Sequence, residues 1–425
     1  MNNKLEYVLG FLLVFVAIYL GITQLKESIL FFRLIVGTGF GYALARAVIG
    51  FSGSVGRPFR TGSTRLMQVL VMMFVGTAIL SVSLLYNADL SQFHLRIYPI
   101  SIGAIAGGLL FGFGMAMTGC CASGALTTLA SSLPRAAITL FFFMMGVFVG
   151  FPVQKNAAWV KNSLISTATG RTQKGGVFFP DLFKWDGVEG YLGAVLLSIL
   201  LAGIVIYFAK IYESRQRAAG NFKGIAIEKE QSNCPEDEEN FSLFSERTYY
   251  QWFVKPWSMS TGAFVIMAMF LMLLSVTHKG WGITTSFGYW FGKIILLFGS
   301  SPEALADFTG KKVSAFTTPF FEHASSIQNF GILLGVVIYY LTAGKLMKSL
   351  SSGWNLKLSD ILMYVFGGFF MGFGTRLANG CNVGALYSPI ATFSLSGWIF
   401  LATMTAGAIV GNIVARRINP SCAIC

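Results

Sequence analysis

Two blocks of this chain, 260 residues apart, share one pattern of glycine and cysteine. Residues 107–126 read GGLLFGFGMAMTGCCASGAL, and residues 367–386 read GGFFMGFGTRLANGCNVGAL. Nine of the twenty positions are identical without a gap, including five glycines and the pair Cys121 and Cys381. Each block is an apolar segment that breaks at glycine beside a thiol. A duplicated, interrupted apolar segment is the best sequence pointer to the binding site of a membrane transporter.

The composition is that of an integral membrane protein. The chain has 425 residues, of which 54% are hydrophobic and only 12% are charged, whereas soluble domains carry about 25% charged residues. Several uncharged runs reach the roughly 20 residues that a helix needs to cross a bilayer. The net charge of +13 does not indicate nucleic-acid binding, because the basic residues are spread over short loops, as the positive-inside rule predicts.

The hydrophobic runs predict an all-α polytopic fold with about ten transmembrane helices. The predicted spans are 7–25, 29–49, 66–86, 99–118, 136–151, 189–209, 258–276, 329–347, 360–378 and 397–414.

Basic loops give an orientation in the plasma (inner) membrane, with both termini cytoplasmic. Segments 152–188 and 277–328 then face outward. Five segments are expected inside. They are the loop that contains Arg57, Arg60 and Arg65, the loop that contains Arg135, the loop of residues 210–256, the turn that contains the lysines at 345, 348 and 357, and the tail that contains Arg416 and Arg417.

The orientation predicts that the two glycine-cysteine blocks enter the membrane from opposite faces. This holds if segment 281–299 is interfacial or re-entrant, as Trp281 and Lys293 favour. Opposite orientation is typical of inverted repeats, so we expect two inverted, pseudo-symmetric halves with short re-entrant half-helices.

The expected division is an N-terminal half (1–209), a cytoplasmic linker (210–257) and a C-terminal half (258–425). The linker carries an acidic run at 236–239 between basic clusters. A disordered connector is the first interpretation of such a polar stretch, and a partner-docking segment is the second.

Each block predicts an anion site. The helix ends at Gly119 or beside Gly380, where glycine makes a backbone break inexpensive, and a short half-helix then starts near Cys121 or Cys381. Irregular backbone at membrane depth is tolerated only inside protein or beside a water-filled cavity. The positive end of a half-helix facing such a cavity binds anions. Cys120 is a further candidate, although Gly380 stands in its place in the second block.

Two arginines complete the predicted site. Arg376 lies inside the ninth span, where a charge costs roughly 2.5–3.5 kcal/mol and is expected to face the protein interior or a cavity. Arg46 lies near the end of the second span, and Arg33 near its start. For Arg46 and Arg33 the alternative is that the side chains extend to the membrane surface.

Other polar residues give no metal or cofactor site. His94, His278 and His323 fall in separate predicted outer loops, and no ATP-binding or other cofactor motif is present. Cys234 lies in the linker, and Cys422 and Cys425 form a terminal pair that we interpret as a frayed tail with reactive thiols.

The blocks at 107–126 and 367–386, with residues 37–65, resemble the YeeE/YedE family of sulphur-transport membrane proteins. The resemblance implies an hourglass-like bundle of inverted halves that takes up thiosulfate through a narrow path lined by cysteines. Carried over, the path thiols are Cys121 and Cys381. This chain departs from the family at Gly50, where members typically carry a further cysteine.

The resemblance leaves two alternatives open. One is a transporter of the same fold for a selenium compound, and the other is a membrane thiol enzyme or sulphur transferase. The expected partners are thiosulfate or a similar sulphur or selenium anion, the lipid bilayer, and a cytoplasmic sulphur-carrier protein as a candidate recipient.

Overall fold

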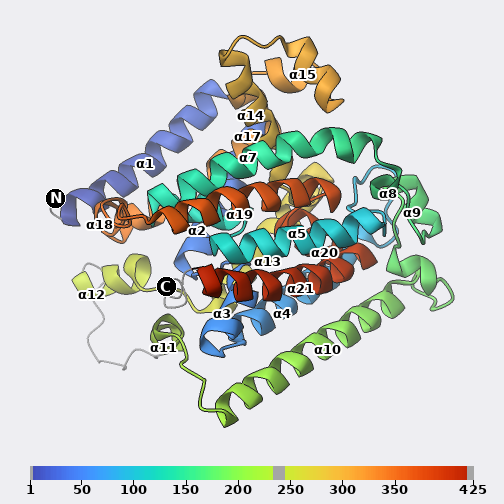
Figure 1. Cartoon of the computed structure of the whole chain (residues 1–425), viewed down its shortest axis with the longest axis horizontal. Coiled ribbons are helices and arrows are strands. Elements are labelled where there is room, and N and C mark those ends of the chain that lie inside the picture. Colours follow the sequence, from blue (N-terminus) through green and yellow to red (C-terminus); the bar gives the residue numbers. More distant parts are fainter. Residues whose placement is uncertain (1–2, 233–244, 419–425) are drawn as a thin grey trace.

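The computed structural model describes residues 3–232 and 245–418 and is built from helices (Figure 1). Ten helices in these ranges are long and apolar enough to cross a membrane, which confirms the predicted all-α fold and the number of spans. They are α1 (Asn3–Gln24), α2 (Ser28–Arg46), α4 (Arg65–Leu85), α5 (Ile102–Thr118), α7 (Leu133–Asn156), α10 (Tyr191–Ala218), α13 (Met259–Thr277), α17 (Ala324–Thr342), α19 (Leu358–Leu377) and α21 (Leu395–Ile418).

Short helices fill the connections between the long ones. They are α3 (Gly53–Thr61), α6 (Ala122–Thr128), α8 (Ala158–Lys161), α9 (Ala168–Gln173), η1 (Phe179–Leu182), α11 (Ala226–Ser232), α12 (Glu246–Tyr249), η2 (Tyr250–Val254), α14 (Thr284–Leu297), α15 (Pro302–Thr309), α16 (Ser314–Thr317), η3 (Phe320–Glu322), α18 (Leu346–Leu350), η4 (Asn382–Tyr387) and α20 (Ser388–Ala391).

The two helices of the repeated blocks, α5 and α19, lie side by side and antiparallel at the centre (Figure 1). Gly107 lies against the backbone of Gly374, and Gly114 lies against that of Gly367, so the order of contacts is reversed along the chain. A Cβ at any of these glycines would overlap the facing helix. Glycine therefore allows the close crossing, as small residues do between membrane helices.

Each block helix also packs on the helix that follows the other block. Gly108 and Gly112 of α5 lie against Thr403 and Met404 of α21, and glycines 368 and 372 of α19 lie against residues 139–147 of α7. Helices α2 and α17 meet in the same glycine-mediated way. The N-terminal and C-terminal parts of the chain therefore interleave.

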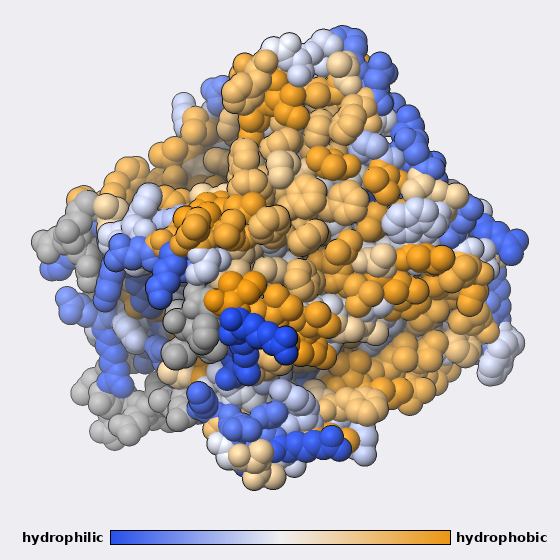
Figure 2. All heavy atoms as spheres, viewed as in Figure 1, coloured by the Kyte–Doolittle hydropathy of each residue, from blue (hydrophilic) through white to orange (hydrophobic). Residues whose placement is uncertain are grey.

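The surface of the bundle is apolar where lipid is expected. Exposed apolar side chains cover α1 and α10, for example Phe15 at 71% and Phe208 at 65% exposure. Figure 2 shows a broad hydrophobic surface over the helices, with hydrophilic residues gathered mainly at its edges. This distribution is the reverse of a soluble protein's and agrees with a helical membrane bundle.

Segment 281–299 contains the helix α14, which has 14 residues. At 1.5 Å per residue it is about 21 Å long and shorter than a full span of roughly 30 Å. Trp281 lies three residues before this helix. It is fully buried and stacks on Phe40, with the ring centroids 3.7 Å apart. The segment therefore contains a helix that is too short for an eleventh full span.

The interpretation of the linker as a disordered connector is wrong for residues 219–232. The chain turns after α10, and Glu228 of α11 accepts hydrogen bonds from Arg57 (3.2 Å) and from the Ser63 hydroxyl (2.7 Å). A partly buried ion pair, which linker composition does not reveal, fixes α11 to the helical bundle. The acidic run 236–239, together with Cys234, Cys422 and Cys425, lies outside the described residues.

Candidate functional site

The long helix of each block ends in the same backbone turn. Gly119 has φ +66° after α5, and Asn379, the aligned residue of the second block, has φ +62° after α19. Cys121 (φ −105°) and Cys381 (φ −101°) follow two residues later in extended conformation and start the short segments α6 and η4. Glycine and asparagine are the residues that best adopt a left-handed turn after a helix.

The predicted thiols are all buried. Cys121 is the N-cap of α6, and its sulphur accepts a hydrogen bond from the Gly124 amide at 3.3 Å. Cys121 and Cys381 are both part of the main hydrophobic core of the bundle. Cys120 is also buried and free. The three side chains are therefore enclosed by protein, and a thiol is a weak hydrogen-bond donor and acceptor.

Gly380 has a packing role next to Cys381. A Cβ at this position would lie 2.7 Å from the amide nitrogen of Ala385, so no larger residue fits without a shift of the η4 backbone. Gly380 thus lets the chain fold back tightly after Cys381.

Asn382 joins the two blocks and was not among the predicted site residues. Its amide nitrogen donates to the sulphur of Met115 at 3.3 Å, and its Oδ1 is buried without a partner in the described part of the chain. An asparagine directly after the cysteine of an apolar segment is the sequence signal that could have identified it.

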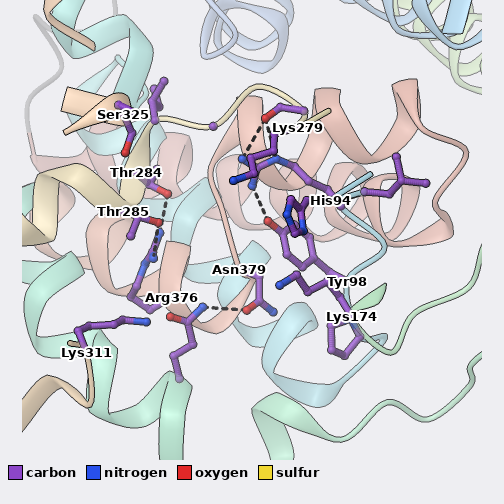
Figure 3. A pocket seen from close by; sticks show the side chains of 18 of the residues that line it. His94, Tyr98, Lys174, Lys279, Thr284, Thr285, Lys311, Ser325, Arg376 and Asn379 are labelled. Atoms are coloured by element: carbon purple, nitrogen blue, oxygen red, sulfur yellow. Dashed lines mark hydrogen bonds between the residues drawn. The ribbon is translucent and has the colours of Figure 1, made fainter. Parts of the chain in front are cut away.

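A cavity of about 720 Å³, here called the cationic cavity, reaches the second block at Arg376 and Asn379 (Figure 3). Among the residues that the structure describes, its lining includes seven lysines or arginines and no aspartate or glutamate. The seven are Arg33, Arg96, Lys161, Lys174, Lys279, Lys311 and Arg376. Such one-sided charge in a concave site concentrates anions.

Arg376 is held in the cationic cavity by hydroxyl groups. Its side chain is 2% exposed, and its guanidinium donates to Thr284 and Thr285 (Figure 3). The guanidinium also lies 5.4 Å from the centre of the Phe151 ring. The sequence prediction that Arg376 faces the protein interior or a cavity is confirmed. No described carboxylate on the cavity wall neutralises its positive charge.

Lys311 approaches the same aromatic ring. Its ammonium nitrogen lies 4.7 Å from the centre of the Phe151 ring. Burial, followed by repulsion from Arg376, lowers the pKa of Lys311 to about 8. An anion in this corner of the cavity would relieve that repulsion.

A second cavity of about 450 Å³ reaches the first block at Met115 and Gly119. Its wall also includes Arg57 and Arg60, and residues 224–226 before and within α11. Because α5 and α19 are antiparallel, the turns at Gly119 and Asn379 lie at opposite ends of the helix pair. The two cavities therefore approach the blocks from opposite ends.

Arg135 closes the first turn and was predicted only as a loop residue. Its Nε donates to the Thr118 carbonyl at 2.9 Å. A Cβ on Gly119 would overlap this guanidinium. The residue fixes the end of α5 beside the second cavity.

Arg46 is placed apart from both cavities. Its guanidinium donates to the Lys255 carbonyl (3.2 Å) and the Gln251 carbonyl (3.1 Å), and lies 4.7 Å from the Trp257 ring centre. It is buried and fixes the segment that precedes α13. Arg33 instead lines the cationic cavity. For Arg46 the alternative that the side chain extends to the membrane surface is wrong, because the side chain is buried and bonded to backbone carbonyls.

Comparison with known proteins agrees with the membrane architecture. Two curated relatives are described as the probable transporter YedE. The one from Salmonella typhimurium is 28% identical over 166 residues, which is 38% of this chain and 38% of the relative. The one from Escherichia coli strain K12 is 26% identical over 168 residues, 38% of this chain and 39% of the relative.

The aligned region thus spans about two fifths of the length of each relative. The family described as sulphur transport matches residues 46–410, which include both blocks and both cavity-bordering turns. This chain therefore belongs to the sulphur transport family of membrane proteins.

Proposed function

We propose that the chain carries thiosulfate, or a related small sulphur-containing anion, into the cell along a central path between the two cavities. One observation carries the proposal. The cationic cavity reaches the turn at Asn379, the second cavity reaches the aligned turn at Gly119, and the thiols that follow these turns are both buried in the main core of the bundle.

The arrangement supports two inverted, pseudo-symmetric halves of hourglass-like shape. The antiparallel crossing pairs Gly107 with Gly374 and Gly114 with Gly367. Exchanging the two aligned blocks converts the first contact into the second, as a twofold relation requires. Inverted repeats commonly hold their substrate at the interface between the repeats.

The cationic cavity is proposed to face outward. Its lysines at 161, 174, 279 and 311 come from segments that charge bias places outside, whereas Arg57 and Arg60 of the second cavity come from a loop that it places inside. A divalent anion would collect in the cationic cavity, pass Arg376 and Asn379, and meet Cys381 and then Cys121.

The thiols are proposed to act by weak hydrogen bonds. A thiol donates a hydrogen bond from its S–H group to the anion and is not deprotonated, so no covalent bond forms or breaks. Weak contacts suit passage, because an ion must leave each site as readily as it enters. Neither cavity needs a cofactor for this role, and we infer a transporter rather than an enzyme.

The test is uptake of radiolabelled thiosulfate by proteoliposomes that contain the full-length protein. Cys121→Ala and Cys381→Ala are each expected to abolish uptake while the protein still inserts and folds. Cys120→Ala is the matched variant, since Cys120 is equally buried but has no counterpart in the second block; it is expected to retain most uptake. Full uptake by both of the first two variants would contradict the assigned path.

The substrate is identified in the same assay by competition. Unlabelled thiosulfate, sulfate, selenite and selenate are each added in excess over labelled thiosulfate. Strong inhibition by unlabelled thiosulfate alone supports the sulphur assignment, whereas stronger inhibition by a selenium oxyanion would favour the selenium alternative.

A further inference from the structure

The wall of the cationic cavity between α2 and α17 contains two hydrogen-bond donors without an acceptor. Arg33 Nη1 donates to Gln328 Oε1 at 2.9 Å. Because a guanidinium has no acceptor, this bond orients the Gln328 amide so that its NH₂ group points away from Arg33. Arg33 Nε and Gln328 Nε2 are both buried, and neither has a hydrogen-bond partner within residues 3–232 and 245–418.

The backbone around this pair is rigidly packed. A Cβ on Gly37 of α2 would overlap the carbonyl group of Gln328, and one on Gly331 would lie 2.6 Å from the Leu34 carbonyl oxygen. Gln328 itself is 1% exposed. The two donors therefore have little freedom to rotate toward other protein acceptors.

The local electrostatics favour a negative ligand. Ser325 lines the cavity in the first turn of α17, and the amino end of a 19-residue helix carries a partial positive charge. Arg96 acts electrostatically on both Arg33 and Arg376. No carboxylate of the described chain lines the cavity, and no described residue accepts a hydrogen bond from Arg33 Nε or Gln328 Nε2.

We propose that Arg33 and Gln328, together with Ser325, form a binding site for a small oxyanion of the sulfate and thiosulfate class. The anion accepts hydrogen bonds from the guanidinium, the amide and the start of α17. The idea that this site holds the ion before it moves on to Arg376 rests on the proposed transport function. The existence of the site does not depend on that function.

The decisive variant is Gln328→Glu. A glutamate here would pair with Arg33 and fill the place of the anion with its own carboxylate. If the residues bind an oxyanion, binding falls although the protein is at least as stable. If their role is only structural, the new ion pair leaves binding unchanged.

The measurement is equilibrium dialysis of labelled sulfate and labelled thiosulfate against the full-length protein in detergent, with the thermal unfolding midpoint measured in parallel. Gln328→Glu is expected to remove one bound ion per chain. Arg33→Gln is expected to weaken that binding about ten- to hundredfold, as loss of a charged donor does. Unchanged stoichiometry and affinity in a folded Gln328→Glu protein would overturn the site.

Arg171→Gln is the control for loss of one positive charge. Arg171 is exposed, donates to Ser166 and does not line the cavity, so its replacement is expected to leave binding unchanged. Loss of binding in this control would mean that general charge, rather than the Arg33–Gln328 pair, holds the ion, and would also overturn the site.

The binding and uptake assays separate the two proposals. Loss of the bound ion in Gln328→Glu, with no uptake of any sulphur oxyanion by wild-type proteoliposomes, supports the site and refutes transport. Normal wild-type uptake with unaltered binding in Gln328→Glu refutes the site and leaves transport standing.

Discussion

Gly119→Ala is expected to destabilise the protein and to reduce uptake, because the turn before the two cysteines has no room for a methyl group. Gly119 has φ +66°. A Cβ there would overlap the Arg135 guanidinium, which donates to the Thr118 carbonyl at 2.9 Å from Nε. Alanine therefore imposes backbone strain and also displaces a charged hydrogen bond.

The magnitude follows from these two effects. The left-handed conformation costs an L-residue about 1–2 kcal/mol, and loss of the Arg135 hydrogen bond to Thr118 costs about 1.5–3 kcal/mol. Alanine offsets about 0.4–1 kcal/mol of this loss, because it lowers the conformational entropy of the unfolded chain. The net destabilisation is therefore about 1.5–4.5 kcal/mol. Because the turn positions Cys121, thiosulfate uptake by the folded fraction is also expected to fall.

The assay is reversible unfolding in detergent, with uptake measured on the same preparations. Gly203→Ala is the matched control: Gly203 lies within α10, and a Cβ added there would have no described atom within 4 Å. It is expected to be neutral or slightly stabilising, since alanine is favoured over glycine in a helix by about 1 kcal/mol.

A double-mutant cycle with Arg135→Ala tests the physical reason. In the Arg135→Ala background, Gly119→Ala should cost only the backbone strain, so the coupling between the two changes should be about 1.5–3 kcal/mol. Additivity of the two changes within about 0.5 kcal/mol would refute the predicted overlap. A Gly119→Ala protein as stable as Gly203→Ala would refute the whole argument.

Two further predictions concern the cavities. The pKa of Lys311 is lowered to about 8, so its side chain is charged below that pH and neutral above it, and the KM for thiosulfate should rise as the pH increases through about 8. Lys311→Arg should remove this pH dependence, and an unchanged pH profile of the KM in that variant would contradict the prediction. Glu228→Gln breaks the partly buried ion pair with Arg57, so hydrogen exchange in residues 221–232 should increase at least about tenfold, as loss of about 1.4 kcal/mol or more predicts; unaltered exchange would show that α11 is held by other contacts.

The membrane architecture could be predicted from sequence because it depends on local composition. A span requires about 20 predominantly apolar residues, and the ten runs could each be recognised from their own composition without reference to any other. The repeated block was also visible directly, since nine matching positions need no structure to align them. Its glycines predicted close helix contact, and α5 and α19 do cross through them.

The partners of individual polar side chains could not be predicted in this way. Arg46 and Arg376 look alike in the sequence, as single arginines within apolar spans. Arg46 donates hydrogen bonds to backbone carbonyls away from both cavities. Arg376 instead lines the cationic cavity and donates hydrogen bonds to threonine hydroxyls. The difference arises from residues 209 and 91 positions away in the chain, which no local pattern encodes.

The sequence by itself determined the class of protein, the number of membrane helices, and the two broken segments with their thiols. Only the tertiary structure decided that cations from both halves of the chain line one cavity, that α11 packs against the second cavity, and that Arg33 and Gln328 present donors without an acceptor among the described residues. The physical reason is range: hydrophobic length and glycine breaks act along the chain, whereas charge, burial and hydrogen bonding depend on residues that only folding brings together.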